Sequence, residues 1–70
     1  MDWDKLRIFD AAAQALSLTA AGEKLGLSQS AVSRQISALE ASTGVPLFQR
    51  HARGLMLTSA GKALHDHVRE

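Results

Sequence analysis

Two histidines and an aspartate lie close together near the end of the chain, where they could bind a metal ion or form part of a catalytic triad. Histidine is the commonest metal ligand and general base. On a helix, residues two apart point about 200° away from each other, so His65 and His67 cannot hold one ion. Asp66, between them, would be exposed on the same helix. We therefore interpret both histidines as surface or interface residues.

The other candidates for catalysis lack the neighbours that their chemistry needs. Ser28 and Ser30 stand at a predicted helix start without the flanking glycines of a nucleophile elbow. Gly54 is at the wrong spacing from Gly61 for a phosphate loop, and Ala63 replaces the required hydroxyl. Because the chain has no cysteine, thiol nucleophiles, thiolate metal sites and disulfides are excluded. We expect no enzyme, no metal and no cofactor.

A polar helix face in the middle of the chain points to a different chemistry. At the helical period its members share a sector roughly 140° wide, on which nothing is acidic or large and apolar. A face that serves only solubility usually carries Lys and Glu, because Ser is a poor helix former. Short hydroxyls allow close approach to another surface, and Gln and Arg can reach base edges or phosphates. The face consists of Gln29, Ser30, Ser33, Arg34 and Ser37.

The formal net charge of +1 conceals an uneven distribution. Residues 1–27 carry three basic and four acidic side chains, and residues 58–70 are balanced. Residues 28–57 carry three arginines against one glutamate, and are therefore the best candidate for a surface that faces an anion. Three solubilising arginines on a solvated face are the alternative interpretation.

Length and composition indicate one small, mainly α domain. Seventy residues leave no room for a separate catalytic domain. Ala and Leu dominate the apolar residues, whereas Val and Ile are few, so helix is favoured over sheet. No apolar run approaches the roughly 20 residues of a membrane span, and the first residues are acidic where a signal peptide would be basic. We expect a cytoplasmic protein without membrane contact.

Three helices are predicted before residue 45. Apolar residues three and four apart predict the first over about residues 4–15, with Trp3 covering the core or an interface. Ser17 and Ser28 are good N-caps and Gly26 and Gly44 are typical stop signals, which bounds the second and third helices. The expected core faces are Leu6, Phe9, Ala13 and Leu16 in the first helix, and Val32, Ile36 and Leu39 in the third.

The second and third helices have the spacing of a helix-turn-helix. Their connection is about four residues long, and the third helix presents polar side chains from its first turns. Gly22, inside the second helix, costs roughly 1 kcal/mol relative to Ala, which close packing against a neighbouring helix would justify. Plain helical hairpins share this spacing, so DNA recognition and a structural hairpin are equally supported by these residues alone.

Residues 47–57 predict a small β-hairpin. Two short apolar runs flank residues 51–54, where Gly54 can take the positive backbone torsion of a tight turn. Phe48 and Leu57 would point inward. An arginine-bearing hairpin just after a helix-turn-helix is a wing, placed to meet phosphates or the minor groove. The exposed tip would carry Arg50, His51 and Arg53.

Thr58 is predicted to cap a fourth helix with an apolar stripe. The pattern is unfinished at Glu70, so we expect either the front piece of something longer or a helix that pairs with another copy. The stripe consists of Ala60, Leu64 and Val68, with Ala63 and His67 alongside.

Several strings together resemble one family, the LysR-type transcriptional regulators, and specifically their N-terminal winged helix-turn-helix. They are SLTAA at 17–21, LGLSQSAVSRQI at 25–36, LE at 39–40, GVPLFQR at 44–50, RG at 53–54 and LTSAG at 57–61. The match runs nearly end to end without gaps and includes both the third helix and the wing.

The resemblance implies a winged helix-turn-helix with a three-helix core, a two-stranded wing and a linker helix. It places the helix-turn-helix at about 18–37, the wing at about 47–57, the DNA-binding domain at 1–58 and the start of the linker at 59–70. In the family the third helix enters the major groove of double-stranded DNA. Residues at matching positions are Gln29, Ser30, Ala31, Ser33, Arg34 and Ser37 on that helix, Thr19 near phosphates, and Arg50 and Arg53 on backbone or minor groove.

The resemblance also implies an assembly. The linker helix pairs two subunits in the family, so Ala60, Leu64, His67 and Val68 are the expected dimer contacts on a pseudo-palindromic operator. Full-length members form a homodimer that can extend to a tetramer, and they sense small-molecule inducers through an effector-binding domain that this chain lacks. Such a protein works in the cytoplasm, associated with the nucleoid when it binds DNA.

Three positions depart from the family pattern. Ser30 stands where Pro is usual, which makes the first turn of the third helix less rigid but adds a hydroxyl donor. Gly22 replaces Ala and Leu18 replaces a common Phe, which affects the rigidity of the second helix. The alternative from another functional class is a winged helix that holds a protein partner without binding DNA.

Overall fold

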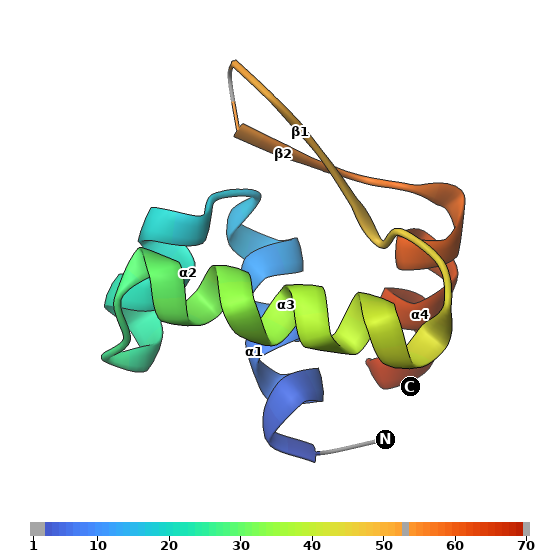
Figure 1. Ribbon diagram of the computed structural model, residues 1–70, viewed down its shortest axis with the longest axis horizontal. Coiled ribbons are helices and arrows are strands. Elements are labelled where there is room, and N and C mark those ends of the chain that lie inside the picture. Colours follow the sequence, from blue (N-terminus) through green and yellow to red (C-terminus); the bar gives the residue numbers. More distant parts are fainter. Residues whose placement is uncertain (1–2, 53, 70) are drawn as a thin grey trace.

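The computed structural model describes residues 3–52 and 54–69 (Figure 1). Four helices and one two-stranded antiparallel sheet agree with the expected winged helix-turn-helix architecture. The third helix crosses the front of the first in Figure 1, and the hairpin stands above it. In chain order the elements are α1 (Trp3–Ala15), α2 (Leu18–Leu25), α3 (Gln29–Thr43), β1 (Phe48–His51), β2 (Gly54–Leu57) and α4 (Ser59–Val68).

The helix boundaries follow the predicted caps. Ser17, Ser28 and Thr58 each accept a hydrogen bond from the backbone N–H three residues on, at 3.0–3.1 Å. Such a bond satisfies one of the four amide groups that a helix start leaves unpaired. Gly26 and Gly44 take φ values of 71° and 77°, the left-handed conformation that ends a helix without steric cost. Local side-chain chemistry therefore fixes where α2, α3 and α4 begin.

The core lies where α1, α2 and α3 meet under the hairpin. Its largest fully buried side chains are Phe9, Leu39, Leu47 and Val32. The rings of Phe9 and Phe48 lie 5.4 Å apart and tilted by 56°, which joins the hairpin to α1. The predicted core face of α3 is confirmed in full.

The predicted core face of α1 is partly wrong. Phe9 and Ala13 are buried, but Leu6 is half-buried and Leu16 is exposed. Ile8, Ala11 and Ala12 are buried in addition, because α2, α3 and α4 all pack on α1 and enclose a wider sector of it. Trp3 is 70% exposed, so it does not cover the core.

The hairpin lies within the predicted range 47–57, and both strands extend one residue further toward the tip than predicted. Phe48 is paired with Leu57 and Arg50 with Leu55. Phe48 and Leu57 both point inward as predicted: Phe48 is buried and the half-buried Leu57 packs against the core, while Leu55 is the buried residue of β2. A two-stranded sheet is marginal alone, and these residues attach this one to the helices.

Two helical glycines are sites of close approach. An ideal Cβ on Gly22 would lie 2.5 Å from the carbonyl oxygen of Leu27. The expected close packing is therefore present, although the neighbour is the connection to α3 rather than another helix. A Cβ on Gly61 would lie 2.0 Å from the carbonyl oxygen of Leu47, which already accepts the Thr58 N–H at 3.0 Å. α4 thus begins in direct contact with the base of the hairpin.

The contact at Gly61 predicts that Gly61→Ala destabilises the fold by about 2–3 kcal/mol, because a methyl group there forces α4 away from residue 47. Urea unfolding followed by circular dichroism measures this. The matched control is Gly26→Ala, where a Cβ meets nothing within 4 Å and only the positive φ is strained, at about 1 kcal/mol. Equal losses in the two variants would contradict the steric explanation.

Candidate nucleic-acid interface

The polar face of α3 is open to solvent as predicted. Gln29, Ser30, Arg34 and Ser37 are exposed, and Ser33 is half-buried beside the hairpin. No acidic side chain lies among them, and the N-terminus of α3 adds the positive end of the helix dipole. Ala31, the other predicted position on this helix, is half-buried. The face therefore offers hydrogen-bond donors, one cation and little bulk.

Arg50 connects the hairpin to this face. Its Nη2 donates a hydrogen bond to Ser33 Oγ at 2.7 Å, across 17 residues of sequence. Arg50 is exposed as expected, but its side chain turns back toward α3 instead of standing at the tip. Arg53, predicted beside it, lies outside the described residues.

The strand register explains this direction. Side chains two residues apart in a strand share a face, so Arg50 projects from the same side as Phe48. Leu55 and Leu57, opposite these two residues, also lie on that side, and it is the side that packs on the helices. On this side of β1, Arg50 lies nearer the tip than Phe48. Its long side chain extends past the apolar residues of the hairpin to reach Ser33.

Glu40 fixes the start of the hairpin on α3. Its Oε2 accepts the backbone N–H of Leu47 at 2.7 Å and that of Phe48 at 3.2 Å. A carboxylate that accepts two amide N–H groups forms charge-assisted bonds, which are stronger than neutral ones. The sequence interpretation counted Glu40 as a charge and as part of one family string, and it missed this role. A lone acid one helical turn before Gly44 and Pro46 was the available signal.

The second strand is attached at another point. The Leu55 N–H donates to the carbonyl oxygen of Leu16 at 3.2 Å. Leu16 has a φ of 51°, an uncommon value for a residue with a side chain, in the turn between α1 and α2. β1 is thus anchored to α3 and β2 to the turn between α1 and α2, and both anchors hold the wing beside the helix-turn-helix.

A hollow of about 230 Å³ lies between the start of α2, the start of α3 and the hairpin. It brings together three residues that the sequence proposed for contact with DNA, namely Thr19, Gln29 and Arg50. His51, from the same strand as Arg50, also lines it. Donor groups from three separate elements therefore converge on one concave surface.

The residues of the predicted dimer stripe on α4 differ in their burial. Ala60 and Leu64 pack against the chain's own core, Val68 is half-buried, and His67 is exposed. A second hollow, of about 240 Å³, lies between α1 and the end of α4. It is lined by Trp3, Leu6, Arg7, Asp10, Val68 and Arg69.

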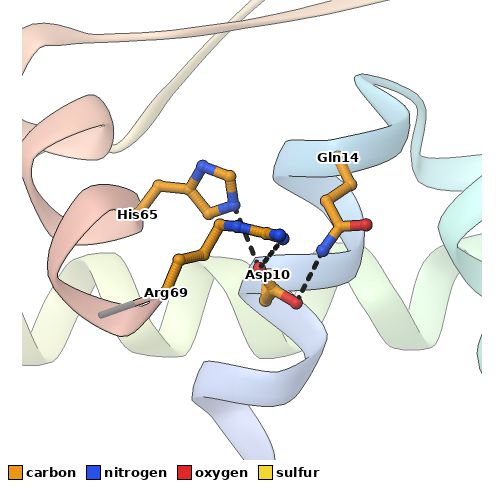
Figure 2. Close-up of polar contacts among 4 residues, drawn as sticks. All are labelled: Asp10, Gln14, His65 and Arg69. Atoms are coloured by element: carbon orange, nitrogen blue, oxygen red, sulfur yellow. Dashed lines mark hydrogen bonds and ion pairs between the residues drawn. The ribbon is translucent and has the colours of Figure 1, made fainter.

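Asp10 joins α1 to α4, as Figure 2 shows. Its Oδ1 lies 3.0 Å from His65 Nε2 and 3.7 Å from Arg69 Nη1, while Oδ2 accepts a hydrogen bond from Gln14 Nε2 at 3.0 Å. The ring of His65 also meets Phe9 edge-on, with centroids 6.1 Å apart. His65 is therefore an internal contact that orients α4, a role that the sequence interpretation missed.

Two other findings concern the described residues as a set. Across residues 3–52 and 54–69, no group of three His, Asp or Glu side chains is placed to hold a metal ion. None of the helices in those ranges has the length and apolar character needed to cross a bilayer.

The two hydrogen bonds at Glu40 predict that Glu40→Ala destabilises the fold by about 2 kcal/mol, because two amide groups near the core lose their acceptor. Urea unfolding measures the loss, and amide exchange at residues 47 and 48 should accelerate. Glu40→Gln keeps an acceptor oxygen and should lose less. The control is Glu23→Ala on exposed α2 surface. If Glu40→Ala unfolds at the same urea concentration as the control, the anchor contributes nothing.

Comparison with known proteins gives concordant results. Residues 3–62 match the family model for bacterial regulatory helix-turn-helix proteins of the LysR family. The HTH-type transcriptional regulator CbbR of Rhodospirillum rubrum is 51% identical over 65 residues, which are 93% of this chain and 22% of that protein. This chain thus spans about a fifth of the length of the curated relatives it matches.

Two solved structures of DNA complexes have the same fold. The CbnR_DBD–DNA complex superposes with a TM-score of 0.94 at 42% identity, covering 99% of this chain and 79% of that one. The BenM_DBD/catB site 1 DNA complex gives a TM-score of 0.94 at 33% identity, covering 99% and 78%. Since the family model covers most of the chain and the relatives agree with it, the chain belongs to the LysR family of bacterial regulatory helix-turn-helix proteins.

Proposed function

We propose that this chain is the sequence-specific DNA-binding domain of a bacterial transcription regulator. The observation that carries the proposal is the exposed face of α3, which is rich in short hydroxyls, free of acid and flanked by an anchored wing. A helix with this surface fits the major groove, and a hairpin beside it reaches the backbone or the minor groove. The similarity to two protein–DNA complexes supports this function.

The proposal divides the contacts by chemistry. Gln29, Ser30, Ser33 and Arg34 select bases, because their donors and acceptors extend from the first turns of α3. Ala31 and Ser37 allow close approach without adding charge. Thr19, at the exposed start of α2, faces a phosphate, and the wing arginines Arg50 and Arg53 supply affinity for the backbone.

We propose further that two copies act together through α4. Because Ala60 and Leu64 already pack on the core, the apolar surface left for a partner centres on Val68, with His67 beside it and Trp3 and Leu6 across the hollow. One copy brings few cations to DNA, and a dimer doubles that number on a pseudo-palindromic operator.

The remaining parts of the proposal concern the whole regulator. It acts in the cytoplasm and has no enzymatic activity. The full-length regulator has a further effector-binding domain, which binds a small-molecule inducer. Full-length copies associate as dimers or tetramers.

Selection from a random pool of DNA duplexes tests the proposed function. Enrichment of a site with two inverted half-sites, and an affinity that falls steeply between low and moderate salt, is the expected result, because bound phosphates release counterions. A chain that enriches no sequence and whose binding is insensitive to salt would instead favour the protein-interaction class.

For Arg34 we predict that Arg34→Ala weakens binding to the selected site by about 1–3 kcal/mol and relaxes the preference at one base pair, as for an arginine on a guanine edge. Titration of the selected duplex and of a scrambled duplex measures both effects. Lys62→Ala, which removes one charge from an exposed position on α4, is the control. An equal loss on both duplexes would make Arg34 a phosphate contact.

A further inference from the structure

The hydrogen bond from Arg50 to Ser33 ties the wing to a base-selecting position. Among the proposed contact residues in the described part of the chain, these two are the pair that a side chain–side chain hydrogen bond joins. The bond is short at 2.7 Å, and its donor is charged. Ser33 lies in the middle of the polar face, one helical turn from Gln29, Ser30 and Ser37, so a change in its hydroxyl alters the centre of that face.

The bond determines what the Ser33 hydroxyl can offer to a ligand. A serine hydroxyl can donate one hydrogen bond and accept two, and without constraint it rotates to suit its partner. A guanidinium has only donors, so Arg50 occupies an acceptor site on Ser33 Oγ. No hydrogen bond donated by the Ser33 hydroxyl occurs within residues 3–52 and 54–69. The hydroxyl proton therefore remains to be given outward.

We infer that Arg50 is a positioning residue that makes Ser33 a fixed hydrogen-bond donor, and so sets a base preference from the wing. This inference rests on the proposed DNA-binding function. A fixed donor favours an acceptor on the major-groove edge, namely guanine N7 or O6, adenine N7 or thymine O4, over the amino group of cytosine. A freely rotating hydroxyl can pair with an acceptor or with a donor on the base edge, so it does not discriminate between bases.

This role is separable from the charge of Arg50. One N–H of the guanidinium is used on Ser33, and four others remain available to a phosphate in the hollow that Arg50 shares with Thr19 and Gln29. A phosphate contact raises affinity equally for all sequences, whereas the contact with Ser33 changes the relative affinity for different bases. Arg50→Lys keeps the charge but loses the planar fork, so it isolates the second effect.

The first measurement uses the free protein. In ¹⁵N-labelled chain, the guanidinium signals of Arg50 should shift in Ser33→Ala, because the acceptor is removed. Ser37→Ala makes the same substitution on the same face of α3 and should leave these signals unchanged. If the Arg50 signals are identical in the wild type and in Ser33→Ala, the coupling is absent and the inference is overturned, while the proposed function is unaffected.

The second measurement uses DNA. A panel of duplexes carries each base in turn at every position of the selected site, and is titrated against wild type, Ser33→Ala, Arg50→Lys and the double variant. At the position where Ser33→Ala removes a preference of about 5-fold or more, Arg50→Lys should reduce it to within about 2-fold. The double variant should discriminate no less than Ser33→Ala alone. Circular dichroism confirms that each variant is folded.

The outcomes separate a failure of the inference about Arg50 from a failure of the proposed DNA-binding function. If Arg50→Lys leaves every base preference unchanged or weakens all duplexes by one factor, Arg50 is a backbone contact and the inference is overturned. If the wild type shows no preferred site at all, the proposed function fails and the inference fails with it. Loss of preference at the Ser33 position alone, with normal affinity elsewhere, supports the inference.

Discussion

The Glu40 carboxylate is the contact on which the geometry of the proposed DNA-binding surface depends. It accepts the N–H groups of residues 47 and 48 from a position on α3, so the chain that leaves α3 folds back against that helix. Two strands of four residues each have little stability of their own. Their position comes from this carboxylate, from the burial of Leu47 and Phe48, and from the contact of α4 at Gly61. The wing is thus part of the same rigid body as α3.

This rigidity matters because the proposed contact residues come from three elements. Thr19 belongs to α2, Gln29 and Ser33 to α3, and Arg50 to β1, yet the hollow and the hydrogen bonds bring them onto one surface. Surfaces that are held in place before binding lose less conformational freedom on association. A chain of net charge +1 can then act on an anion, because residues 28–57 carry three arginines against one glutamate and the N-termini of α2 and α3 both border the hollow.

The sequence predicted what depends on neighbours along the chain. Caps at Ser17, Ser28 and Thr58, stops at Gly26 and Gly44, and the core face of α3 are all local or periodic signals, and the structure confirms each. It did not predict contacts between distant residues. The bond of Arg50 to Ser33, the bonds of Glu40 to the hairpin and the bonds of Asp10 to α4 all depend on how elements pack, which composition and spacing do not encode. Family resemblance could place Arg50 on the wing, but the direction of its side chain required coordinates.

The serines of α3 show how function and helix stability are balanced. Ser is a weaker helix former than Ala, Lys or Glu, so a face with three of them reduces the intrinsic stability of the helix. The opposite face offsets this through the burial of Val32, Ile36 and Leu39, and Ser28 and Gly44 close both ends. Tertiary packing therefore leaves the outer face free to be selected for contact rather than for helix formation. On that face a hydroxyl whose direction is defined discriminates between base edges, since a rotating hydroxyl pairs with any of them. A guanidinium from a separate, anchored element is a means of defining it.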